Sequence, residues 1–305
     1  MRDEARPLER ASWLLIAAML ALFIALQLRS PFALAPLGLA VATLTLGLLA
    51  CGWRRTAGRG QSCAAAGAVA LIQMTLFTLL GVAITYMLTA QAGALWDEHF
   101  AQADRALGLN WPAVRAVLDK RPLVVTALGF SYHSLALQMV AAICALSAAG
   151  RLDILRITVF AALSSGLLTV LLSGLFPANG NIFEPADYRH LWPSIPWQQI
   201  ELLHGLRSGA IRTIDLLQLE GIVTFPSYHA TLSVLFAWSF RSVPGLRIAG
   251  PVWASLTLLA TPIFGGHYMV DVLAGALLGI VSLVAGIGLA SDRYAATMPR
   301  QRLSI

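Results

Sequence analysis

Long apolar runs, separated by short polar segments, dominate the chain. About 20 consecutive apolar residues are needed for a helix to cross a hydrocarbon core of roughly 30 Å. Eight runs come close to or exceed this length: residues 12–28, 32–51, 63–89, 123–149, 153–176, 226–243, 247–264 and 268–290. The pattern therefore predicts an all-α fold, a polytopic membrane helical bundle.

The composition supports this interpretation. Of the 305 residues, 58% are hydrophobic and only 12% are charged, which is about half the charged share of a typical soluble domain. The net charge is +6, but the basic residues mostly flank the apolar runs, and no nucleic-acid-binding motif accompanies them. We therefore expect the bilayer, and no nucleic acid, as a partner.

The polar clusters divide the chain into three parts. We expect residues 63–290 to form a six-span core, because every polar cluster lies there. Residues 1–62 are predicted to add two N-terminal spans, and residues 291–305 form a basic tail. More than half of the 21 basic residues lie on the side that holds both chain ends. By the positive-inside rule, both termini are then cytoplasmic, in an inner or plasma membrane.

Two longer polar segments fall on the opposite, extracytoplasmic side. Residues 92–122 are amphipathic, with aromatic residues such as Trp96 and Phe100, which predicts an interfacial helix. Residues 177–225 are rich in Pro, Gly and Trp, and we expect a helix from Ile200 to Leu219. Long ordered loops are usually functional, so this segment is predicted to cover a binding site.

Two short polar clusters, each with a histidine, begin the sixth and the eighth apolar runs. They read Phe225-Pro226-Ser227-Tyr228-His229 and Gly266-His267-Tyr268-x-x-Asp271. Two antiparallel crossings lie between the clusters, so the chain returns to the face that it left. Both histidines are therefore expected to meet on the extracytoplasmic side.

The second cluster has the spacing of a reactive histidine and its carboxylate partner. If the last span begins near Gly266, His267 and Asp271 share one helix face, with Cβ atoms about 6 Å apart. A carboxylate bonded to one imidazole nitrogen fixes the tautomer and leaves the other nitrogen free to attack. A purely structural pair at a helix end is the alternative.

The first cluster has the features of a phosphate-binding helix start. Pro226 suits the first turn of a helix, and Ser227 can offer its hydroxyl beside the free amides of that turn. His229 follows within the turn and could donate a proton to a leaving alkoxide. An ordinary capped helix is the alternative.

Together the two clusters resemble the motifs of the type 2 phosphatidic-acid phosphatase superfamily. They are most similar to the branch that contains the inositol phosphorylceramide synthases, which are inositolphosphotransferases. The resemblance covers about residues 63–290 and implies a six-span helical core, no metal or other cofactor, and a phosphohistidine intermediate. It implies His267 as the nucleophile, Asp271 as its orienting carboxylate, His229 as the proton donor to the leaving group, and Ser227 as a phosphate ligand.

The chain departs from this pattern in its cations. The family's Ser-Arg pair before the nucleophilic histidine is replaced by Ala260 and Thr261, and the upstream basic motif is absent. An anionic transition state without a cation loses a large electrostatic stabilisation. We therefore expect residues of the external loops and helix starts to hold the phosphate: Arg189, Arg207 or Arg212, together with Tyr228 and Gly266.

A polar stripe crosses the fourth apolar run at Tyr132, His133, Ser134 and Gln138. Polar side chains inside a membrane often join helices by hydrogen bonds. We interpret the stripe as a packing device, with substrate contact as the alternative.

The predicted function is that of an integral-membrane lipid phosphatase or phosphotransferase. Its substrate is a lipid phosphate at the extracytoplasmic face, and its acceptor is water or an alcohol such as inositol. Two alternatives stay open: a metal-dependent hydrolase in which His229, His267 and Asp271 bind zinc, and a non-catalytic lipid transporter or binding protein.

Overall fold

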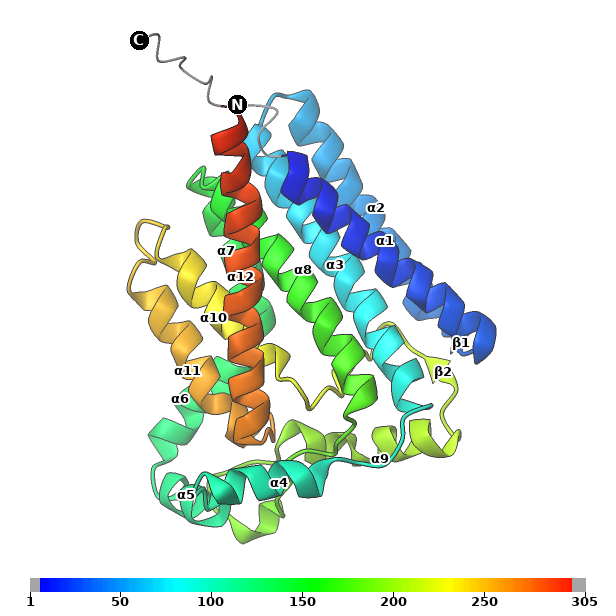
Figure 1. Cartoon of the computed structure of the whole chain (residues 1–305), viewed down its shortest axis with the longest axis vertical. Coiled ribbons are helices and arrows are strands. Elements are labelled where there is room, and N and C mark those ends of the chain that lie inside the picture. Colours follow the sequence, from blue (N-terminus) through cyan, green and yellow to red (C-terminus); the bar gives the residue numbers. More distant parts are fainter. Residues whose placement is uncertain (1–5, 298–305) are drawn as a thin grey trace, which may run out of the picture.

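The computed structural model of the protein describes residues 6–297 (Figure 1). Within this range it is almost entirely helical. The bundle helices are α1 Arg6–Arg29, α2 Pro36–Gly58, α3 Ser62–Thr89, α6 Pro122–His133, α7 Leu135–Ala148, α8 Leu152–Leu175, α10 Tyr228–Phe240, α11 Ala249–Phe264 and α12 Met269–Thr297. The other elements are α4 Asp97–Ala106, α5 Trp111–Asp119, α9 Ile195–Ser208, the 3-10 turn η1 Pro185–Asp187, and the two-residue strands β1 Ala33–Leu34 and β2 Thr213–Ile214.

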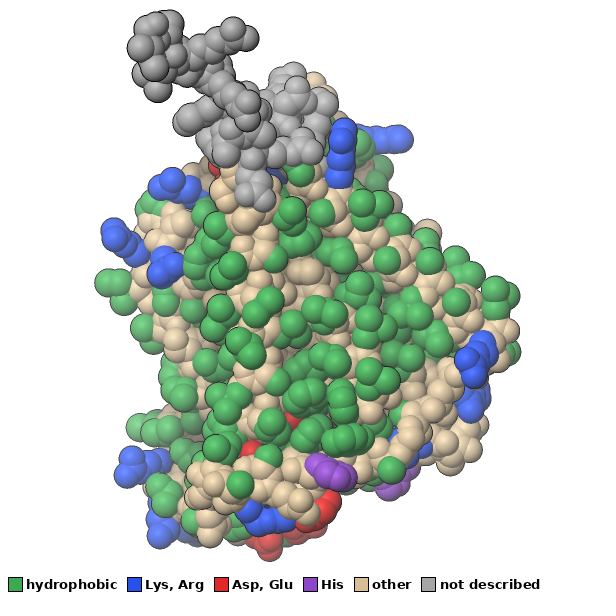
Figure 2. Space-filling view, in the orientation of Figure 1, with side chains coloured by type: hydrophobic (Ala, Val, Ile, Leu, Met, Phe, Trp, Pro, Cys, Tyr) green, Lys and Arg blue, Asp and Glu red, His purple; other side chains and the backbone are tan. Residues whose placement is uncertain are grey.

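The predicted helical membrane bundle is confirmed, although its spans differ in length from those expected. Within residues 6–297, five helices are long and apolar enough to cross a membrane, namely α1, α2, α3, α8 and α12, and a sixth span results if α6 and α7 are counted together. The runs 226–243 and 247–264 form α10 and α11, whose 13 and 16 residues are shorter than a full crossing requires. Hydrophobic side chains cover the middle of the face in Figure 2, and charged ones lie mostly toward its two ends.

The predicted fourth span is a broken helix. Its two halves, α6 and α7, meet at Ser134 and are bent by 60°. The Ser134 hydroxyl accepts a hydrogen bond from the Trp253 indole at 2.9 Å, and the Gln138 amide donates to the Thr257 hydroxyl at 2.7 Å. These bonds tie the break to α11, which confirms the packing interpretation for this half of the polar stripe.

Small residues bring α12 into close contact with α10. A methyl group at Gly275 would overlap the carbonyl of Ser227, and one at Gly279 would lie 3.0 Å from the carbonyl oxygen of Thr231. The Thr231 hydroxyl donates to the Gly275 carbonyl at 2.7 Å. Glycines four residues apart allow helices in a membrane to approach closely, and here they fix the two helices that follow the two histidine clusters.

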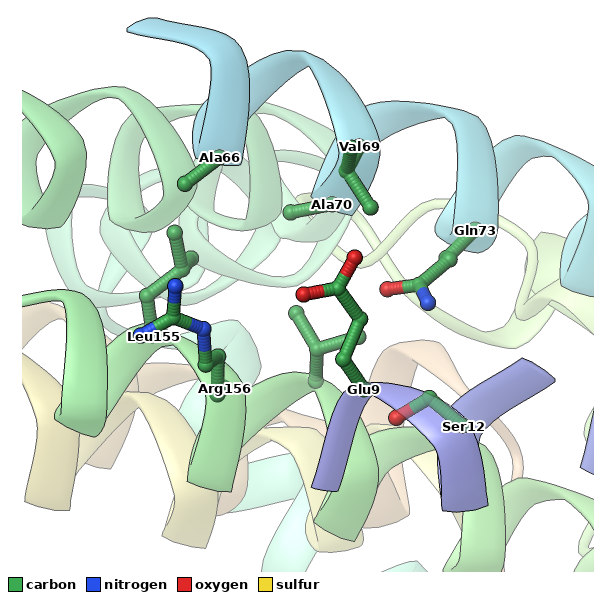
Figure 3. A pocket seen from close by; sticks show the side chains of 9 residues that line it. Glu9, Ser12, Ala66, Val69, Ala70, Gln73, Leu155 and Arg156 are labelled. Atoms are coloured by element: carbon green, nitrogen blue, oxygen red, sulfur yellow. The ribbon is translucent and has the colours of Figure 1, made fainter. Parts of the chain in front are cut away.

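The N-terminal helix pair is joined to the rest at both of its ends. Near the beginning of α1, Glu9 and Ser12 face Gln73 of α3 and Arg156 of α8 across a small cavity of about 20 Å³ (Figure 3). At the other end, β1 in the α1–α2 turn pairs in parallel with β2, in the segment after α9. Arg2, Arg300, Arg302 and the end of the predicted basic tail lie outside the described residues.

The helices α4, α5 and α9 lie across one end of the bundle, which we call the histidine end (Figure 1). Residues 92–122 contain helices as expected, but the helix expected from Ile200 to Leu219 is wrong in its bounds. It runs from Ile195 to Ser208, because Pro196 favours its first turn and Gly209, at φ +83°, ends it in a left-handed cap.

Candidate active site

Both histidines line the same small cavity at the histidine end of the bundle. This cavity of about 40 Å³, called here the histidine cavity, is bounded by His229 from the first turn of α10 and by His267 from the turn before α12. Tyr132, Asn179 and Gln199 supply further polar groups to its wall. The folding of the chain thus brings together side chains that are 38 positions apart in the sequence, counted from 229 to 267.

His267 lies beside the carboxylate that the sequence paired with it. Its Nδ1 is 3.4 Å from Oδ2 of Asp271, and only 3% of His267 and none of Asp271 is exposed. The pair does not share a helix face as expected, because α12 begins only at Met269 and His267 precedes it. Asp271 also accepts the backbone N–H of Tyr268 at 2.8 Å, so its carboxylate holds the turn before α12 and lies beside the imidazole without a hydrogen bond to it. The other ring nitrogen of His267, Nε2, is not the one that faces Asp271.

The turn before α12 is formed with the help of one glycine and anchored by a neighbouring loop. Gly266 has φ +57°, a conformation that side chains with a Cβ rarely adopt. Its carbonyl accepts the N–H of Asn181 at 2.5 Å. Arg115 of α5 then binds Asn181 through the carbonyl at 3.0 Å and the side-chain oxygen at 2.6 Å. A buried cation therefore stabilises the loop that supports His267.

Two carboxylates of α4 complete this support. The buried Asp104 accepts the N–H of Met269 at 3.0 Å and the indole N–H of Trp111 at 2.6 Å. Asp97 accepts the N–H of Gly180 at 2.9 Å and the hydroxyl of Tyr268 at 3.1 Å. Neither carboxylate was predicted from the sequence, although a signal for both is present there. Asp97, Phe100 and Asp104 recur at helical spacing, so they mark one inward face of the segment.

His229 is held by an aromatic neighbour rather than by a carboxylate. Its ring stacks on that of Tyr132, with centroids 4.2 Å apart and planes 10° apart. A methyl group at Gly265 would lie 2.8 Å from the Tyr132 hydroxyl and 2.7 Å from Cδ2 of His267, so Tyr132 spans the distance between the two histidines. The sequence placed Tyr132 in a packing stripe, whereas the structure places it in the cavity wall.

The other residues predicted around the phosphate have structural roles in this geometry. Ser227 is fully buried and caps α10, with its hydroxyl accepting the N–H of Ala230 at 3.3 Å. The Tyr228 hydroxyl donates to the carbonyl of Ala162 at 2.9 Å, on α8. Gly266 shapes the turn, but only its neighbour Gly265 lines the histidine cavity.

None of the three predicted arginines lines the histidine cavity. Arg189 is exposed in the loop before α9, and Arg212 lies over the ring of Phe32 at 5.0 Å. Arg207 is nearest, because it lines an adjacent small cavity that shares Leu203, Ile222 and Thr224 with the histidine cavity. Its guanidinium donates to the carbonyl of Gly93 at 2.8 Å. Among the residues that the structure describes, no Lys or Arg side chain lines the histidine cavity.

A family model described as PAP2 superfamily matches residues 98–285. The match covers more than half of the chain and includes both histidine clusters. The chain belongs to the PAP2 superfamily. It is thus an integral membrane protein with the phosphatase-type fold of that superfamily, and its two histidines lie inside the matched region. The match does not single out the inositol phosphorylceramide synthase branch. Searches among curated proteins and solved structures gave no match.

The zinc alternative lacks a set of ligands in this fold. Across residues 6–297, no three side chains of His, Cys, Asp or Glu lie close enough together to hold a metal ion. His229 faces Tyr132, and the carboxylate of Asp271 is turned toward the backbone before α12.

Proposed function

We propose that the protein is a metal-independent lipid phosphatase or phosphotransferase that works through a phosphohistidine. The observation that carries this proposal is the meeting of His229 and His267 at one cavity, with Asp271 3.4 Å from Nδ1 of His267. Membership of a superfamily of membrane phosphatases supports the same reaction class.

In the first step, Nε2 of His267 attacks the phosphorus of a lipid phosphate. The bond between phosphorus and the lipid oxygen breaks, and protonated His229 gives its proton to the leaving alkoxide. Asp271 stabilises the positive charge that develops on the His267 ring. In the second step, water or an alcohol attacks the phosphorus and displaces Nε2, while His229 takes the proton of the attacking hydroxyl.

The phosphate needs positive charge that the histidine cavity does not supply in this structure. Arg207 is our candidate among the three predicted arginines. It lies one cavity away, and its Nη1 is buried without a hydrogen-bond partner. Release from the Gly93 carbonyl would let the guanidinium reach toward the phosphate. The backbone amides at the start of α10 would add further partial positive charge.

The reaction would take place at the extracytoplasmic face of an inner or plasma membrane. By the positive-inside rule, the basic residues favour a cytoplasmic position for both chain ends. The start of α1 and the end of α12 lie at the end of the bundle opposite the histidine end (Figure 1). Phosphatidate, polyprenyl phosphates and sphingolipid-type phosphates remain candidate substrates. Inositol is a candidate acceptor, as the resemblance to the synthase branch implies.

Purified protein assayed against lipid phosphates, with and without inositol, tests the proposal. We expect phosphate release or transfer by the wild type and a loss of at least about 1,000-fold in His267→Ala, because removal of a nucleophile costs more than this in known enzymes. His229→Ala should lose about 100- to 10,000-fold. His204→Ala is the matched control, since His204 is exposed on α9 and does not line the histidine cavity.

A trapping experiment separates catalysis from transport. With a substrate labelled in the phosphoryl group, rapid quenching should leave label on the wild type and none on His267→Ala. Retained turnover in His267→Ala would exclude this mechanism. An absence of both turnover and labelled histidine in the wild type would instead favour the transporter or binding protein.

A further inference from the structure

A second, much larger cavity adjoins the histidine cavity. It has a volume of about 500 Å³, which is within the range of roughly 300–1,000 Å³ for ligand sites in proteins. Six residues line both spaces: Tyr132, Ile195, Gln199, Gly221, Val223 and His229. The two spaces therefore meet at His229, and we call the larger one the bundle cavity.

The walls of the bundle cavity change in character with distance from the histidines. The ionisable side chains of His133 and Glu220 and the amide of Gln199 lie near the shared wall, whereas the hydroxyls of three threonines are distributed along α3 and α8. Deeper in the bundle the wall is formed mainly by apolar side chains of α3, α7, α8 and α10, including Met74, Phe77, Met139, Val170 and Leu232. Such a gradient fits a molecule with a polar head at the histidines and a hydrocarbon chain in the bundle.

The bundle cavity opens sideways between α3 and the bent pair α6–α7. At the far end α3 and α7 are in close contact, since a methyl group at Gly67 would lie 2.6 Å from the Ser147 hydroxyl oxygen. Nearer the histidines, α6 bends away by 60°. There the lining side chains of Thr78, His133 and Ala136 are exposed. These positions belong to spanning segments, so the opening faces the hydrocarbon of the bilayer.

We propose that the bundle cavity binds the hydrocarbon chain of the lipid phosphate, which enters from the bilayer between α3 and the α6–α7 break. In this proposal the bundle cavity holds one chain. The preferred substrate is therefore a phosphate monoester with a single long apolar chain, rather than a two-chain phosphatidate. This inference rests on the proposed function for the position of the phosphate, but the chain site itself can be tested by binding alone.

Trp substitutions at the rim test the inference. Ala136→Trp on α7 and Thr78→Trp on α3 both place a large ring at the opening, from opposite walls. Both residues are exposed, so folding should tolerate the change. Leu137→Trp is the matched control, because Leu137 is 56% exposed and does not line the bundle cavity. The measurement is kcat/KM for a long-chain alkyl monophosphate divided by that for a short-chain one, with dialkyl phosphatidate assayed in parallel.

We expect the wild type and Leu137→Trp to favour the long chain by at least about 100-fold. Each rim variant should reduce this preference by about tenfold or more. Equal preferences in the rim variants and the control would overturn the inference, as would faster turnover of phosphatidate than of the single-chain substrate by the wild type.

Binding of a long-chain alkylphosphonate to His267→Ala, measured by native mass spectrometry, keeps the two proposals distinct. Suppose that Ala136→Trp, introduced into His267→Ala, abolishes binding of the alkylphosphonate, and that the wild type turns over no substrate. This result would support the chain site and reject the proposed function. Turnover by the wild type with chain binding unaffected by both rim variants would reject the chain site and leave the function standing.

Discussion

The rings of Tyr132 and His229 are stacked, with centroids 4.2 Å apart. They come from different helices, since Tyr132 lies near the end of α6 and His229 in the first turn of α10. In the proposed mechanism, this contact fixes the plane in which His229 meets the leaving group.

Removal of the stacked ring should therefore impair catalysis more than removal of the hydroxyl. We expect Tyr132→Ala to lower kcat by about tenfold, which is the upper part of the range for an aromatic pair worth about 0.5–1.5 kcal/mol. Tyr132→Phe keeps the ring and should stay within about threefold of the wild type. Steady-state kinetics on the preferred lipid phosphate measure both. An equal loss in the two variants would assign the role to the hydroxyl instead.

Asp104 should be important for stability although it lies on a short helix outside the bundle. Its carboxylate binds the first N–H of α12 and the Trp111 indole, and it is only 2% exposed. Asp104→Asn exchanges an acceptor oxygen for a donor, and we expect a loss of about 1–3 kcal/mol. Unfolding in detergent micelles measures this loss. Glu98→Gln on the same helix is the control, because the Glu98–Arg105 pair is exposed and should contribute little.

The contact between α10 and α12 should not tolerate a side chain at Gly275. Gly275→Ala would force its methyl group into the Ser227 carbonyl, and overpacking of this kind costs about 1–3 kcal/mol. Because Ser227 begins the helix that carries His229, we also expect reduced turnover. Gly288→Ala in the same helix is the control, since its methyl group would meet no atom within 4 Å. Similar melting temperatures for the two variants would argue against the close packing described here.

The loop before α9 should lose stability in acid. Asp119 accepts the backbone N–H groups of His190, Arg189 and Leu191. The bonds from His190 and then Arg189 lower the pKa of this carboxyl below its ordinary value. Because the pKa of Asp119 is lowered in the folded state, its carboxylate contributes fully to the stability of the fold at pH values above the pKa of the unfolded state. This contribution is lost as the pH falls through the pKa of the folded state.

Asp119→Asn should therefore differ from the wild type mainly at neutral pH. We expect the gap between their thermal unfolding midpoints in micelles to narrow from neutral pH toward about pH 3. A gap that stays constant over this range would show that the charge of Asp119 is not what holds the loop.

The fold class and the meeting of the histidines were predictable because hydrophobic periodicity and span number follow directly from residue order. The bend at Ser134 was not predictable, because apolar residues continue across it and only tertiary hydrogen bonds to Trp253 and Thr257 reveal the break. Where the three predicted arginines lie relative to the histidine cavity was not predictable for a related reason. Loop cations depend on where a long segment folds, and Arg207 and Arg212 found partners in Gly93 and Phe32.

The parallel pairing of β1 with β2 connects the first two helices to the segment that bounds both cavities. The chain after α9 continues from β2 to Gly221 and Val223, which bound both cavities. Residues 33 and 34 thus anchor the segment that forms part of both cavity walls, although the family match begins only at residue 98. A truncated protein limited to the matched region would lack this anchor and the whole α3 wall of the bundle cavity, so a variant that keeps both cavities intact must begin well upstream of residue 98.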